Sequence, residues 1–228
     1  MATAAKKIEV YLERGKKRTV AGVLGWPGWC RAGGDEDEAL AALQAAGQRY
    51  ADVLDAAGIN VPVPADGSAF AVVERLAGKG ATDMGIPVIP PSLDADPVDA
   101  KDMERLQAIL KACWKALDKA AEHAEGKTLR LGPRGGGRDL DGILEHVRGA
   151  EQGYLASLGG KAPKDKDGQP DDQAVRKAIL ETLEASARGE IPAKGPRGGT
   201  RWSPRYCVRR MAWHILDHIW ELEDRAAD

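Results

Sequence analysis

The first part of the chain alternates apolar and polar positions in short runs. Ile8, Val10 and Leu12 fall on one side of an extended segment, which is the period-2 pattern of a half-buried strand. A short basic turn follows, and residues 18–26 return as a second apolar run. Two such runs joined by a short turn predict a β-hairpin.

Helical spacing replaces this alternation after a Gly- and Pro-rich stretch. Asp35 is a suitable N-cap, Glu38 follows three residues later, and alanine and leucine recur at helical spacing up to a stop at Gly58. The pattern predicts one helix over this interval. Two further short strands are predicted at residues 59–64 and 69–78.

Composition changes again between residues 79 and 97, which are rich in Gly and Pro and have no period. We interpret this part as a linker or wrapping segment. Beyond it, four amphipathic stretches predict an antiparallel four-helix bundle of up-down-up-down type over residues 98–228. With residues 1–78 as a small α/β domain, the fold class is α+β. The predicted helices cover residues 97–126, 138–160, 171–190 and 203–228.

Charge and cysteine usage narrow the class of protein. The chain has 228 residues, and its 33 basic and 35 acidic residues leave a formal net charge of −2, so neither nucleic-acid nor membrane-surface binding is indicated. Its three cysteines are widely separated and include no C-x-x-C pair, which favours a reducing compartment. No apolar run is long enough to cross a bilayer. We expect a cytoplasmic protein.

The chain contains only four histidines. His214 and His218 are four residues apart in the last predicted helix, so both rings point to one face, roughly 6 Å apart. Such a pair can chelate one metal ion, or it can be packed on a helical face without one. His146 lies on the side of the second predicted helix that borders the core. His123, in the last turn of the first, suits the helix dipole.

Two similar loops bear on whether these histidines meet. Residues 131–139 and 194–202 share Gly-Pro-Arg-Gly-Gly, and each loop leads into a helix. In an up-down-up-down order the second and fourth helices run the same way, so their N-termini share one end. At about 1.5 Å per residue, His146 then lies roughly 10 Å along its helix, His214 roughly 15 Å along the other, and His218 about 6 Å further. We therefore predict a three-histidine metal site.

Three neutral imidazoles and one open position suit Zn²⁺, with Ni²⁺ or Fe²⁺ as alternatives. The open position would hold a water molecule or a substrate thiolate. Three nearby carboxylates could orient the imidazole rings: Asp141, Glu145 and Asp217. For at least two of these, a solvated position on the surface is the better explanation.

The segment from about residue 97 to 228 resembles the DinB/YfiT-like superfamily of four-helix bundles. The resemblance rests on "ILEHVRGAE", which contains His146, and on "AWHILDH", which contains His214 and His218. It implies a divalent metal held by these histidines. For characterised relatives it also implies metal-dependent transfer of a low-molecular-weight thiol such as mycothiol, bacillithiol or glutathione.

Candidate substrate-binding residues surround this predicted site. Arg210 lies one helical turn before His214 and could hold a carboxylate as a catalytic partner. Arg134 and Arg197, in the two similar loops, would lie at the mouth of the same end of the bundle, where helix N-termini also favour anions. Tyr154 could contribute a hydroxyl. The alternative is that both loops are simply solvated and that Tyr154 belongs to the core.

The stretch "WPGWCRAGGDEDEALAAL" is similar to the turn, strand and helix start of HicB-like antitoxin domains. Trp29 separates Gly28 from Cys30 where the pattern has no such insertion, and no antitoxin function follows from so short a match. We expect Cys30 to be an inert, half-buried thiol rather than a reactive one. The role of this half as lid, dimer surface or partner-binding module stays open.

Taken together, the sequence favours a cytoplasmic bacterial enzyme acting on a small molecule: a metal-dependent thiol transferase, isomerase or hydrolase. The alternative is a non-catalytic bundle that binds a metal or a small ligand, with an N-terminal domain that engages a partner. A third reading treats the histidines as structural. The sequence leaves a homodimer open.

Overall fold

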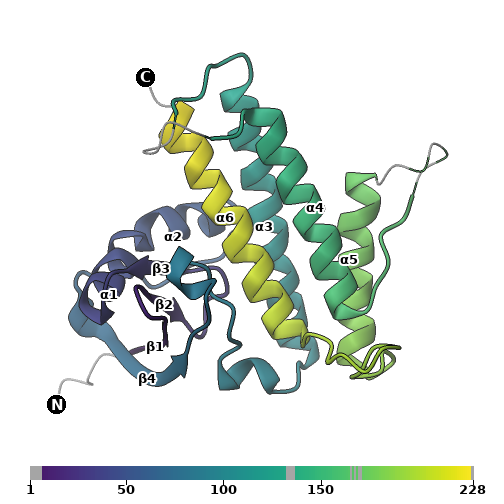
Figure 1. Cartoon of the computed structure of the whole chain (residues 1–228), viewed down its shortest axis with the longest axis horizontal. Helices are drawn as coiled ribbons and strands as arrows, with labels where there is room; N and C mark the ends of the chain where they lie inside the picture. The colour runs from purple at the N-terminus through teal and green to yellow at the C-terminus, as the bar shows by residue number, and fades with distance from the viewer. Residues whose placement is uncertain (1–6, 132–136, 165, 167, 169–170, 227–228) are drawn as a thin grey trace. The chain divides into compact units, whose positions relative to one another are not determined.

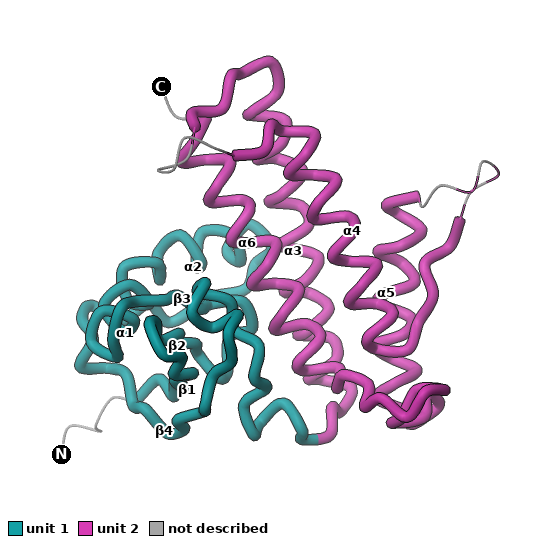
Figure 2. The backbone as a smooth tube through the Cα atoms, in the orientation of Figure 1, with its two compact units in different colours: residues 1–96 teal, residues 97–228 magenta. Residues whose placement is uncertain are grey.

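The computed structural model describes residues 7–131, 137–164, 166, 168 and 171–226. The chain is of mixed α+β class and divides into two compact units, Met1–Asp96 and Pro97–Asp228 (Figure 2). Almost all of the Gly- and Pro-rich stretch at residues 79–97 thus belongs to the first unit. Within the described ranges, no helix has the length and apolar character needed to cross a bilayer.

The first unit is built on a four-stranded sheet in the order β3-β2-β1-β4. Strands β1 (Ile8–Arg14) and β2 (Thr19–Val23) form the predicted antiparallel hairpin. Strand β3 (Cys30–Gly33) pairs antiparallel with β2, and β4 (Phe70–Ala77) pairs parallel with β1. The strand predicted at residues 59–64 is absent, because two prolines in this short run remove ladder donors.

The helix predicted from Asp35 to Gly58 is broken into α1 (Glu36–Ala45) and α2 (Gly47–Asp55). Asp35 caps α1 as predicted, accepting a hydrogen bond from the Glu38 backbone N–H at 2.8 Å. The break has a tertiary cause. The indole N–H of Trp29 donates to the Leu43 carbonyl at 2.8 Å, which is the acceptor that Gly47 would use in a continuous helix.

The segment after β4 is held against the sheet by one buried carboxylate. The side chain of Glu13 on β1 is fully buried and accepts hydrogen bonds from the backbone N–H groups of Val88 (2.9 Å) and Ile89 (3.0 Å) and from the Thr82 hydroxyl (2.5 Å). These contacts make this part of the chain a wrapping segment. Three short 3-10 helices complete the unit: η1 (Gly67–Ala69), η2 (Thr82–Met84) and η3 (Ser92–Ala95).

The second unit consists of four long helices, all of which the sequence predicts (Figure 1). Aspartates cap the first three, and the Ser203 hydroxyl accepts the Tyr206 N–H at the start of the fourth. The helices are α3 (Ala100–Ala124), α4 (Leu140–Leu158), α5 (Asp172–Ala187) and α6 (Pro204–Ala226).

Helices α4 and α6 run antiparallel. The start of α4 lies at the end of α6, where the Arg225 guanidinium donates to the Arg138 carbonyl at 2.8 Å. The end of α4 lies at the start of α6, where the Trp202 N–H donates to the Ser157 carbonyl at 3.0 Å. The up-down-up-down order requires these two helices to be parallel, so that expectation is wrong.

The other helix pairs show the directions in which the four helices of the second unit run. Helices α3 and α6 are parallel, since Arg205 contacts Asp102 near both starts and the Arg130 N–H donates to the Arg225 carbonyl near both ends. Helices α4 and α5 are also parallel. Asp172, at the start of α5, pairs with Arg148 in the first half of α4, and Gly160, just after α4, lies against Thr182 in the second half of α5. The directions are therefore up, down, down and up.

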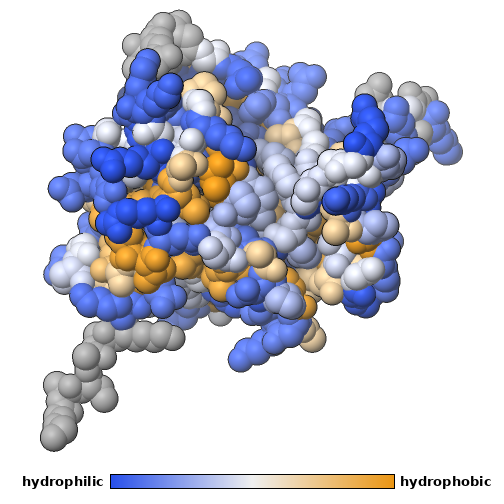
Figure 3. All heavy atoms as spheres, turned by 60° about the horizontal axis from the view of Figure 1, so that its bottom comes forward, coloured by the Kyte–Doolittle hydropathy of each residue, from blue (hydrophilic) through white to orange (hydrophobic). Residues whose placement is uncertain are grey.

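Polar and charged side chains cover most of the face seen in Figure 3, with separate apolar areas between them. The large hydrophobic side chains that stay exposed within the described ranges are few and scattered over both units: Val63, Val73, Met84 and Leu131. Isolated exposed apolar residues of this kind are normal for a folded chain and mark no interface by themselves.

Candidate metal centre

Three imidazoles meet between the middle parts of α4 and α6. His214 and His218 lie one turn apart on α6, with ring centroids 4.7 Å apart. The ring of His146 on α4 lies 5.0 Å from each of them. The predicted trio is therefore brought together in space.

Ring nitrogens, not only ring centres, converge. Nε2 of His146 lies 3.1 Å from Nε2 of His214, and one ligand atom from each of the three residues lies within 4.8 Å of the others. Two nitrogens bound tetrahedrally to Zn²⁺ at 2.0–2.1 Å would be about 3.3 Å apart, so this separation fits such a site. Among the described residues, no other group of three His, Cys, Asp or Glu side chains has this arrangement.

The protonation state also suits metal binding, which requires neutral imidazole. Burial, with smaller contributions from the neighbouring histidines and arginines, lowers the pKa of His214 to about 3. Burial likewise lowers the pKa of His146, with Arg138 as the next cause. Nδ1 of His214 is buried and has no hydrogen-bond partner in the described structure. The two facing Nε2 atoms are thus available as neutral ligands.

Glu221 orients the third imidazole. Its Oε2 lies 2.8 Å from Nδ1 of His218, one turn earlier on α6. Arg225 donates to the other oxygen, Oε1, at 2.6 Å, and is itself fixed by the carbonyls of Arg130 (2.7 Å) and Arg138 (2.8 Å). A carboxylate on Nδ1 leaves Nε2 of His218 as the ligand atom.

The sequence reasoning missed Glu221 and named three other carboxylates. Glu145 and Asp217 are exposed, and Asp141 lines a separate cavity on the other side of α4. The i, i+3 spacing of His218 and Glu221, with Arg225 four residues further on, was the signal that could have found it.

The histidines meet for a different reason from the predicted one. In antiparallel packing, residues oppose each other when they are equally far from a shared contact. His146 lies about two turns into α4 from the contact between Arg138 and Arg225, and His218 lies about two turns back along α6 from the same contact. The parallel orientation is wrong, yet the predicted meeting of the three rings is found.

Arg210 and Tyr154 lie beside this cluster, as predicted. The ring of Tyr154 is 5.8 Å from that of His214, and its hydroxyl accepts a hydrogen bond from Nη2 of Arg210 at 3.4 Å. The guanidinium of Arg210 lies over the rings of Trp213 (4.7 Å) and Tyr154 (5.6 Å). Burial raises the pKa of Tyr154, so this phenol stays protonated at neutral pH. Nη1 of Arg210 is buried without a hydrogen-bond partner.

Comparison of the chain with protein-family models, curated proteins and solved structures finds no match.

The helix starts that follow the two similar loops do not lie at one end of the second unit. Arg134 lies outside the described residues. Arg197 is exposed, in a loop next to the end of α4, where the Arg201 side chain approaches Gly159. Because α4 and α6 are antiparallel, the start of α4 lies at the opposite end from the start of α6, so the expectation that both helix starts share one end is wrong. Arg138, which sequence reasoning did not nominate, is the exposed arginine whose charge acts on His146 and His214.

All three cysteines are buried and unsuited to nucleophilic chemistry. Burial raises the pKa values of Cys113 and Cys207 to about 12. Cys30, expected to be half-buried, is 2% exposed beside the stacked rings of Trp29 and Tyr50. None of the three buried thiols is therefore placed to act as a nucleophile.

Proposed function

We propose that the second unit is a metal-binding four-helix bundle of the DinB/YfiT-like kind. In this proposal His146, His214 and His218 hold one divalent metal ion, with Zn²⁺ first and Ni²⁺ or Fe²⁺ as alternatives. The protein is then a transferase that activates a low-molecular-weight thiol, or water, for attack on a small electrophile. The convergence of one ring nitrogen from each of the three histidines within 4.8 Å carries the proposal.

A bound divalent ion lowers the pKa of a thiol or water in its open position, so that the nucleophile forms at neutral pH. The residues around the site supply binding and orientation. Nη1 of Arg210 offers an unpaired, buried donor for a substrate carboxylate, and the Tyr154 hydroxyl, which stays protonated, offers a second donor beside it. Glu221 keeps the His218 ring in the orientation that presents Nε2.

The test is a transfer assay with mycothiol, bacillithiol and glutathione, each supplied with a model electrophile. We expect one thiol to be consumed faster in the presence of the metal-loaded protein, with the rate lost on chelation and in His218→Ala. His123→Ala removes an exposed histidine away from the site and should retain the transfer rate of the unaltered chain. Equal rates with and without chelator across the whole panel would rule the transferase out.

A non-catalytic metal- or ligand-binding protein is the second candidate, in which the first unit would engage a protein partner. One observation favours it. The Arg210 guanidinium is covered by the faces of Trp213 and Tyr154, an arrangement that already stabilises the charge without a substrate. Stoichiometric metal binding without thiol transfer or hydrolysis in the same panel would support this candidate.

A further inference from the structure

A cavity lies on the opposite side of α4 from the histidines, between α3, α4 and α5. It has a volume of about 380 Å³, within the range of small-ligand sites. Acidic side chains outnumber basic ones among the residues that line it, six to two: Asp118, Glu122, Glu125, Asp141, Glu151 and Asp172 against Arg148 and Arg176.

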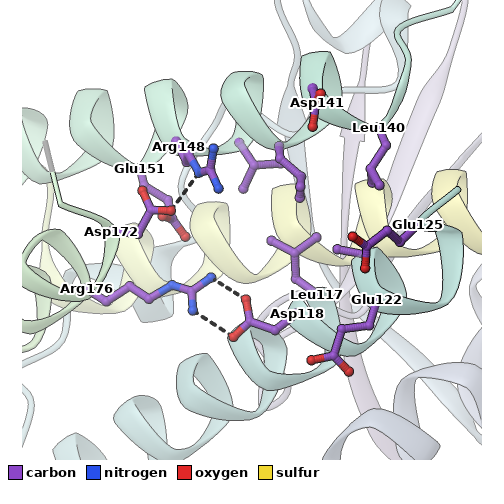
Figure 4. A pocket seen from close by; sticks show the side chains of 13 residues that line it. Leu117, Asp118, Glu122, Glu125, Leu140, Asp141, Arg148, Glu151, Asp172 and Arg176 are labelled. Carbon is purple, nitrogen blue, oxygen red and sulfur yellow. Dashed lines mark hydrogen bonds and ion pairs between the residues drawn. The ribbon is translucent and has the colours of Figure 1, made fainter. Parts of the chain in front are cut away.

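Both arginines are already paired. Arg176 makes a bidentate contact with Asp118, at 2.9 Å for each bond, and Arg148 binds Asp172 at 2.7 Å (Figure 4). Of the remaining carboxylates, Glu151 has Arg176 near enough to lower its pKa, but neither arginine forms an ion pair with it. The cavity therefore carries more negative than positive charge.

One of these carboxylates is buried. Glu151 is only 3% exposed, and its Oε1 accepts the indole N–H of Trp114 at 2.6 Å. Its second oxygen has no hydrogen bond or ion pair with the described residues, and the side chain lines the cavity. Burial raises the pKa of Glu151 to about 7, although the Trp114 hydrogen bond and the charge of Arg176 both act to lower it. A buried carboxylate facing an open cavity is a binding position for a cation.

The remaining carboxylates lie toward the other end of the cavity. Glu122 and Glu125 are on the last turns of α3, and Asp141 is at the start of α4, ten residues before Glu151 and so about 15 Å from it along the helix axis. Figure 4 shows this end apart from the Glu151 end. The wall between the two ends is apolar: Leu117, Ala121, Leu144 and Val147.

This layout distinguishes an organic cation from a metal ion. Within the described part of the chain, the histidine trio is the only group of three or more His, Cys, Asp or Glu side chains close enough for one ion. The carboxylates of the cavity are too far apart for that, but two separated acidic ends joined by an apolar wall match a molecule with two charged ends and an aliphatic middle. We propose that the cavity binds an aliphatic diammonium ion, with one ammonium at Glu151 and the other at the outer carboxylates.

The site is separate from the metal centre and does not depend on the proposed reaction. Calorimetric titration of the full chain, above the Glu151 pKa of about 7, tests it with diaminooctane as the probe. We expect saturable binding at one site per chain, weaker binding of octylamine, and none of the neutral octanediol. Octanediol binding as tightly as the diamine would overturn the proposal, because the acidic ends would then contribute nothing.

Variants identify the residues. Glu151→Gln should weaken diamine binding roughly 30-fold or more, since it removes the buried charge. Ala121→Leu, which fills the cavity and leaves every carboxylate in place, should weaken it too. Glu104→Gln, which changes an exposed glutamate on the same α3 helix, and His218→Ala should both bind like the unaltered chain. Unchanged binding in Glu151→Gln and Ala121→Leu, or displacement of the diamine by Ca²⁺ at one shared site, contradicts the proposal.

Discussion

Nε2 of His146 on α4 lies 3.1 Å from Nε2 of His214 on α6, and both side chains are held neutral by burial. Two neutral imidazoles can share this contact only if the Nε2–H of one donates a hydrogen bond to the Nε2 of the other. A cation between them satisfies both lone pairs at once, and the neighbouring Nε2 of His218 completes a three-nitrogen face.

Metal content is the first prediction. The purified chain should bind one equivalent of Zn²⁺, and His146→Ala and His218→Ala should each lower the affinity more than about 100-fold, because each removes a ligand. His123→Ala is the matched control and should bind like the unaltered chain. Elemental analysis with competitive chelator titration measures this. The metal hypothesis is wrong if the unaltered chain contains no stoichiometric transition metal and its metal affinity equals that of His218→Ala.

Glu221 should act as a positioning residue. Glu221→Gln removes the carboxylate that fixes Nδ1 of His218, so we expect Zn²⁺ affinity to fall about 10- to 100-fold while the helix content is unchanged. Glu145→Gln alters an exposed glutamate next to His146 and should have no effect. The same chelator titration, with circular dichroism, separates the two variants. Equal losses in both would assign the effect to general surface charge.

Glu151 should make stability depend on pH. Its pKa rises from 4.5 to about 7 in the folded state because burial disfavours the charged form, while Trp114 and Arg176 oppose the rise and Asp172 and Asp118 add to it. The folded chain then binds more protons than the unfolded chain between these values, so stability falls as pH rises through this window. The shift corresponds to a loss on the order of 3 kcal/mol.

The measurement compares Glu151→Gln with the unaltered chain by urea unfolding across that pH window. The stability of the variant relative to the unaltered chain should increase with pH and level off above about 7. Glu104→Gln replaces an exposed glutamate, so its unfolding free energy relative to the unaltered chain should not change with pH. If the difference in unfolding free energy for Glu151→Gln is also independent of pH, then folding does not raise the pKa of Glu151.

The cysteines should be unreactive in the folded chain. Since Cys30, Cys113 and Cys207 are buried, and burial raises the pKa values of the last two to about 12, a thiol reagent should label none of them under native conditions. All three should react in denaturant. Spectrophotometric thiol titration checks both states, and rapid native labelling of one cysteine would show that it is accessible.

Local chemistry explains how much of the fold the sequence predicts. The hairpin, β4 and the four long helices follow from apolar spacing and from caps such as Asp35 and Ser203, all of which act within a few residues. The break before Gly47 does not, because it depends on Trp29 taking the Leu43 carbonyl across the unit. The absent strand at residues 59–64 shows that prolines outweigh a weak apolar alternation.

The sequence by itself determined which side chains could hold a metal, since the spacing of His214 and His218 fixes them on one face of a helix wherever that helix lies. Only the tertiary structure decided what they meet. The antiparallel packing of α4 and α6 places His146 opposite the pair. Helix direction depends on packing between faces far apart in the chain, and no local pattern encodes it.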